Sequence, residues 1–130
     1  MLESIFKYQQ SLIDKYLLIE AKNGIGHGLL TDDDYKDGKL DINSHRVQYL
    51  LKDMAWRITE ELGEAMNNLK NRPWKKMHIK TNKAAYEEEL IDAFHFFIEL
   101  LITSGFTPTK LYKAYVTKAD INKKRQSSGY

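Results

Sequence analysis

The sequence contains no cysteine and only two prolines among its 130 residues. The missing cysteine excludes disulfides, thiolate metal ligands and cysteine nucleophiles, so a metal site would have to use oxygen or imidazole ligands. Apolar runs are short: none reaches the ~18 residues that a membrane span needs, and the first residues do not resemble a signal peptide. Basic and acidic residues nearly balance, at 20 and 18, which favours neither nucleic acid nor a membrane surface as a partner. We therefore expect a soluble, cytoplasmic protein.

Strand-like alternation is also almost absent, and the apolar residues recur at helical spacing instead. This pattern predicts an all-α fold, a bundle of four helices in a single domain covering residues 1–130. The expected helices span about residues 3–20, 46–70, 84–104 and 108–125. The last one follows a Thr-Pro pair that is typical of a helix start. The connection from Gly24 to Asn43 is long, and connections of this length are often functional.

One carboxylate of the second expected helix lies close to its apolar face. At 100° per residue, five apolar residues fall within an arc of about 80°; they are Met54, Ile58, Leu62, Ala65 and Leu69. Glu61 lies about 20° outside this arc and Glu64 at its border, whereas Glu60 points to solvent. An ionised carboxylate against apolar surface costs several kcal/mol unless it is paired or bound to a metal. Glu61 therefore needs a compensating partner.

The third expected helix repeats this anomaly, because its apolar residues cover most of its circumference. We expect this helix to be largely enclosed. Glu89 projects among the apolar residues, and Asp92 lies at the border of a narrow polar side that also carries Glu88, His95 and Glu99. Oxygen donors of this kind suit Mg²⁺ or Mn²⁺.

Acidic pairs three residues apart are also frequent on solvated helix faces, and that is the ordinary interpretation of a single pair. Here two pairs occur, Glu61 with Glu64 and Glu89 with Asp92, and a basic tail that could hold phosphates accompanies them. The coincidence favours a metal site over two solvated faces.

Other side chains are of the kinds that hold nucleotides. Trp74 can stack on a base and Lys75 can bind phosphate, although a core tryptophan beside a cationic helix end would look the same. Gln9 lies within the apolar face of the first helix, where a buried amide needs partners. Its amide can form hydrogen bonds either with the polar edge of a pyrimidine base or with the protein backbone.

The last expected helix carries Lys118, Asn122 and Arg125 in one stripe, which is either a phosphate-binding surface or a solvated face. His95 follows Asp92 by three residues and is either a neighbour of the metal ligands or a structural histidine.

These residues together resemble the all-α nucleoside triphosphate pyrophosphohydrolases, and within them the dimeric dUTPases and the dCTP/dUTP pyrophosphatases of T-even phages. Two segments are similar to the superfamily motif: EELGE at residues 60–64 and ELID at 89–92. More specific are RPWKK at 72–76, ELIDAFHFF at 89–97 and the segment 118–130. The resemblance covers about residues 50–130 and, weakly, the first helix.

The resemblance implies Mg²⁺-dependent hydrolysis of dUTP or dCTP to the monophosphate and pyrophosphate. It implies four metal ligands, Glu61, Glu64, Glu89 and Asp92, with Glu61 also orienting or deprotonating the attacking water. Further residues would bind the substrate, at the base or at the sugar and phosphates; they are Gln9, Trp74, Lys75, His95, Lys118, Asn122, Arg125 and Tyr130.

The resemblance also implies a homodimer, located in the host cytoplasm if the protein is phage-encoded. Family members often carry a second amide one turn after Gln9, where this chain has Leu12 and Ile13, so the choice between dUTP and dCTP stays open. Two other functions are compatible with the sequence. One is a broader housekeeping pyrophosphatase acting on purine or damaged nucleotides, and the other is a non-catalytic helical module whose carboxylates bind a structural cation.

Overall fold

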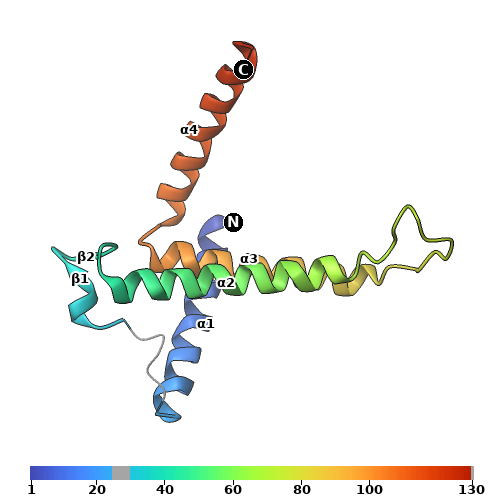
Figure 1. Cartoon of the computed structure of the whole chain (residues 1–130). Helices are drawn as coiled ribbons and strands as arrows, with labels where there is room; N and C mark the ends of the chain where they lie inside the picture. The colour runs from blue at the N-terminus through green and yellow to red at the C-terminus, as the bar shows by residue number, and fades with distance from the viewer. Residues whose placement is uncertain (25–29, 130) are drawn as a thin grey trace.

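A computed structural model describes residues 1–24 and 30–129 and confirms the all-α fold (Figure 1). The four helices are α1 (Leu2–Lys22), α2 (His45–Asn67), α3 (Lys83–Thr103) and α4 (Pro108–Ser127). The cap of α4 forms as expected, because the Thr107 side chain accepts a hydrogen bond from the backbone N–H of Lys110 at 3.2 Å. The second helix ends three residues earlier than the expected bound of 70.

Helices α2 and α3 lie side by side and run in opposite directions, and α1 crosses them (Figure 1). Buried apolar side chains come from all three of these helices; they are Phe6, Val47, Ala65, Ala93 and Ile98. The two buried alanines are short, so α2 and α3 can approach closely. Each alanine follows a carboxylate, Glu61 or Glu89, by one helical turn, so both carboxylates lie on the facing sides of the two helices.

Helix α3 is not largely enclosed within one chain, so that expectation is wrong for the chain by itself. Ile91 is 56% exposed, and Phe94 and Phe97 are each 44% exposed. The reason is that α2 and part of α1 cover only some of the α3 circumference, and α4 projects away instead of packing along the rest (Figure 1). Apolar composition signals burial but does not say what provides it.

The connection between α1 and α2 contains a small hairpin that the sequence analysis did not anticipate. Strands β1 (Tyr35–Lys36) and β2 (Lys39–Leu40) pair antiparallel across Asp37 and Gly38. Both turn residues have positive φ, 53° and 71°, as a type I′ turn requires, and Asp-Gly is a favoured sequence for it. The signal was present, but strands of two residues leave no alternation to detect.

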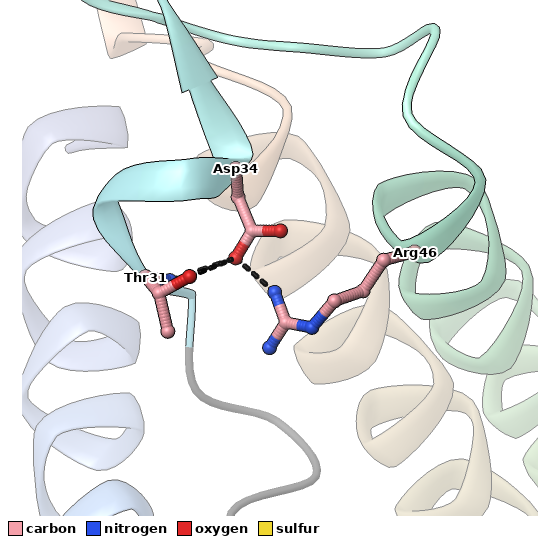
Figure 2. A network of polar contacts seen from close by, with 3 residues as sticks. All are labelled: Thr31, Asp34 and Arg46. Carbon is pink, nitrogen blue, oxygen red and sulfur yellow. Dashed lines mark hydrogen bonds and ion pairs between the residues drawn. The ribbon is translucent and has the colours of Figure 1, made fainter.

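Asp34 attaches this connection to the start of α2 (Figure 2). Its carboxylate accepts hydrogen bonds from the Thr31 backbone N–H at 2.7 Å and from the Thr31 hydroxyl at 3.2 Å, and it forms an ion pair with Arg46. Asp34 is 2% exposed. The Arg46 guanidinium, followed by the Thr31 N–H, holds the pKa of Asp34 below its usual value. The network fixes the connection next to α1 and α2.

Helix α4 projects away from the other helices (Figure 1). None of its residues is buried, and its contacts with the rest of the chain are few. Among the described residues, no single helix is long and apolar enough to cross a membrane. Helices α3 and α4 satisfy that test only as a pair bent by 104°, which is weak support for a span, because core helices pass the same test.

Candidate functional site

Three of the four carboxylates singled out in the sequence lie together between α2 and α3. Glu61, Glu89 and Asp92 each place an oxygen so that all three oxygens lie within 4.8 Å of one another. Glu64 is exposed and lies outside this group, one turn along α2 from Glu61. The arrangement offers three oxygen donors from two helices, which is the donor chemistry that Mg²⁺ and Mn²⁺ prefer.

The electrostatics of this carboxylate cluster centre on Glu61. Burial raises the pKa of its carboxyl group above the usual value, and the negative charges of Glu64, Asp92 and Glu89 raise it further. Glu64 therefore contributes to the potential at the cluster although it is not one of the three converging donors. A divalent cation would offset the negative charges that surround Glu61.

A cavity of about 970 Å³ opens beside the cluster. Residues of α1, α2 and α3 line it, and Glu61 and Asp92 are among them, whereas Trp74 is not. About half of the described lining residues are aliphatic or aromatic, and the rest are polar or charged, five of them carboxylates. The carboxylate cluster thus adjoins a space of ligand size.

Gln9 is buried in the wall of this cavity, 3% exposed, and its amide is held at both ends. Its Nε2 donates to Glu99 Oε2 at 3.5 Å, and its Oε1 lies 2.7 Å from His95 Nδ1. An ionised Glu99 can only accept, so the amino end of Gln9 must face it. The Gln9 oxygen then faces His95, whose Nδ1 must carry the hydrogen. The partners that a buried amide needs are two side chains of α3.

Three charged residues of the cavity wall, Glu20, Arg57 and Glu99, were not singled out as site residues from the sequence. Arg57 forms an ion pair with Asp53, with Nη2 and Oδ2 3.0 Å apart, and it is the only lysine or arginine among the described lining residues. Glu20 carries a buried oxygen, Oε2, that has no hydrogen-bond partner among the described residues.

Burial raises the pKa of Glu99, the charge of Arg57 acts against this, and the charge of Glu20 adds to it. Helical spacing could have pointed to Glu99, which follows Asp92 by seven residues and His95 by four. From the sequence, Glu99 was expected only on the polar side of this helix.

The remaining candidate residues do not reach the cavity within one chain. Trp74 and Lys75 lie in the exposed loop between α2 and α3, whose ends are joined by hydrogen bonds of the Asn71 amide to Ile79 at 2.7 and 2.8 Å. Residues of α4 are also exposed and absent from the cavity wall; they are Lys118, Asn122 and Arg125. Tyr130 lies outside the described residues.

The fold and the site define a class: an all-α protein in which carboxylates from two antiparallel helices converge beside a ligand-sized cavity. The chain belongs to the dUTPase family, whose family model matches residues 29–107, more than half of the chain. The match covers Glu61, Glu89 and Asp92, and family membership implies nucleotide binding and a nucleotide pyrophosphatase activity. A comparison with curated proteins finds no match, and neither does a comparison with solved structures.

Proposed function

We propose that the protein is a Mg²⁺-dependent pyrophosphohydrolase that cleaves dUTP or dCTP to the nucleoside monophosphate and pyrophosphate. The observation that carries this proposal is the convergence of Glu61, Glu89 and Asp92 within 4.8 Å at the edge of the cavity. Cleavage between the α- and β-phosphates requires that a triphosphate approach an acidic cluster, which is unfavourable unless a cation offsets the charge.

The residues present fit such a cation. The three converging donors are carboxylate oxygens, and burial, followed by the charges of the neighbouring carboxylates, raises the pKa of Glu61. Glu61, Glu89 and Asp92 would hold the ion, with Glu64 as a neighbouring carboxylate. When bound, Mg²⁺ neutralises phosphate charge and lowers the pKa of water.

Glu61 is the residue best placed to handle the proton of the attacking water. It faces the other two carboxylates and also lines the cavity, so a water beside it would lie between the cluster and the substrate. We assign Glu61 the role of orienting this water and taking its proton at a carboxylate oxygen. No covalent intermediate is needed.

The cavity would hold the nucleoside, because it extends from Glu61 and Asp92 to the buried amide of Gln9. An amide offers both a donor and an acceptor, as the edge of a pyrimidine does. Arg57 supplies a cation within the same wall. One chain therefore provides an amide for the base and carboxylates for the metal ion at the phosphates. Among the described lining residues of the cavity, it provides only one of the cations that would bind the phosphates directly.

We also propose that two chains associate, because one chain exposes too much surface. Its accessible surface is 10518 Å², whereas a compact 15.2 kDa monomer exposes about 7,100 Å². The exposed apolar side chains of α3 belong to this excess, and an obligate interface, which removes about 2,000–5,000 Å² from the two chains together, would cover part of it. Phe94→Glu should shift the sedimentation of the protein toward the monomer. Tyr49→Glu, at another exposed position, serves as the comparison. A wild-type chain that sediments as a monomer at micromolar concentration would contradict the association.

Pyrophosphate release with Mg²⁺ across a panel of nucleoside triphosphates tests the proposed function. We expect dUTP or dCTP, or both, to be hydrolysed with kcat/KM well above that for purine nucleotides. Preference for purine or damaged nucleotides would indicate the broader housekeeping enzyme. If a folded protein that binds Mg²⁺ released no pyrophosphate from any nucleotide, the non-catalytic helical module would be the remaining function.

A further inference from the structure

The end of the cavity remote from the carboxylate cluster carries an unusual excess of hydrogen-bond acceptors. Glu99 and Glu20 both line it, and one Glu20 oxygen is buried without a partner among the described residues. Gln9 donates to Glu99 from its Nε2, and an amide nitrogen carries two hydrogens, so one N–H is left over. A ligand that brings donors to this end would satisfy these groups.

The spacing along α3 places this end at the distance of a base. Asp92 and Glu99 both line the cavity and are seven residues apart, which is about 10.5 Å along a helix and only ~20° around it. A nucleotide whose phosphates lie at Asp92 would therefore extend its base toward Glu99. Helix α1 crosses α3 here and brings Gln9 to the same place (Figure 1).

We propose that Glu99 reads position 4 of the pyrimidine and makes the enzyme prefer dCTP to dUTP. This inference rests on the proposed function, since it identifies the base that the same cavity selects. Cytosine presents its 4-amino donor next to the N3 acceptor, and a carboxylate beside an amide N–H is the complementary pair. Glu99 accepts from the 4-amino group, and the second N–H of Gln9 donates to N3.

Uracil presents the reverse pattern at the same edge. Its O4 is an acceptor and would face the Glu99 carboxylate, which is also an acceptor, so both groups would lose hydrogen bonds that water had provided. Burial raises the pKa of Glu99, whereas the charge of Arg57 and the hydrogen bond from Gln9 act in the opposite direction.

The test is the ratio of kcat/KM for dCTP to that for dUTP, measured with Mg²⁺ in wild type and Glu99→Gln. A correctly paired base edge is worth about 5- to 150-fold in discrimination, so wild type should prefer dCTP within this range. A glutamine can turn either its oxygen or its amino group toward the base, so Glu99→Gln should bring the ratio at least tenfold closer to dUTP. Glu88→Gln, on an exposed position of the same helix, should leave the ratio unchanged.

Two outcomes would overturn the proposal: a wild-type preference for dUTP, or an unchanged ratio in a folded Glu99→Gln, including an equal loss of both activities. Such an equal loss would mean that Glu99 only holds Gln9 in place. Binding of dCMP and dUMP to the wild-type protein with EDTA provides a second measurement that needs neither catalysis nor the variant, and dCMP should bind more tightly. Equal binding would contradict the assignment. Failure of the proposed function itself would look different, because wild type would then release no pyrophosphate from either nucleotide.

Discussion

The α2–α3 pair and helix α4 differ in how much of their environment one chain provides. Helices α2 and α3 pack against each other along their length and bring three carboxylates within 4.8 Å. Helix α4 follows α3 with a 104° bend and buries none of its residues. The acidic half of the candidate site is therefore assembled within one chain, whereas the basic half, on α4 and on the loop with Trp74, is displayed to solvent. Residues assembled by packing should be sensitive to single substitutions, and displayed residues should act only when substrate or a second chain orders them.

The largest expected effect is on the assembled half. Glu61→Gln and Asp92→Asn should each lower turnover at least ~10²-fold, because each removes a cation ligand or the group that accepts the proton of water. Pyrophosphate release at saturating Mg²⁺ and substrate measures this. Glu60→Gln is the matched control, since Glu60 is exposed on the same helix and bonds to Trp56 Nε1 at 3.0 Å. If either site variant turned over at the wild-type rate, that residue would be removed from the site.

The displayed half should respond in KM instead. Deleting residues 125–130 should raise the KM for the triphosphate about tenfold or more while changing helicity little, because the family resemblance implies that Arg125 and Tyr130 bind the substrate. Lys113→Ala, in the exposed part of α4, is the control. A truncated protein that binds a non-hydrolysable dUTP analogue as tightly as the full chain would show that the end of α4 has no part in binding.

A mixture of these two impaired proteins would sharpen this contrast further. Glu61→Gln retains α4, and the 125–130 deletion retains the carboxylates. If α4 serves the cavity of a second chain, combining them should restore turnover at low substrate concentration above the sum of the separate proteins. Turnover equal to that sum would mean that α4 serves its own chain.

A smaller effect is expected on stability at the carboxylate cluster. Glu61→Gln removes one of the repelling charges, so it should raise the metal-free melting temperature and reduce the increase that Mg²⁺ gives. For wild type that increase corresponds to ~2.7 kcal/mol at about 100 times Kd. Thermal melting with EDTA and with Mg²⁺ measures both. Equal Mg²⁺ increments in the two proteins, or a less stable metal-free variant, would make Glu61 an ordinary structural carboxylate.

The pH dependence of the same melting curves follows from the direction of the Glu61 pKa shift. Because burial and the neighbouring carboxylates raise its pKa in the folded state, protonation favours folding. The metal-free protein should gain this contribution as pH falls through the folded-state pKa, and the contribution is complete below the unfolded value. Mg²⁺ holds the group ionised and should abolish the gain.

The smallest expected effect is at the connection between α1 and α2. Arg46 lowers the pKa of Asp34, so its contribution to stability is present above the unfolded pKa and is lost as pH falls through the folded value. Asp34→Asn should lower the melting temperature slightly at neutral pH and leave kcat at saturating substrate unchanged. Asp33→Asn, at an exposed neighbour, should change neither. A melting temperature unaffected by Asp34→Asn would mean that the connection is held by other contacts.

The sequence alone determined the helices and the acidic pairs. Local features of the sequence predict the helices: the helical period, the Thr107 cap and the near absence of strand alternation. Such features depend only on neighbouring residues, so a single sequence is enough to detect them. The position of Glu61 near an apolar arc was legible for the same reason, since a helix converts spacing directly into direction.

Only the tertiary structure decided which partners these residues meet. The crossing of α1 over α3 joins Gln9 to His95 and Glu99 at a separation of about ninety residues, which no local pattern encodes. The tertiary structure also excluded Glu64 from the converging group, and it left the face of α3 around Phe94 uncovered. Periodicity states which face of a helix prefers to be buried, but burial itself depends on the packing of elements that are distant in the chain.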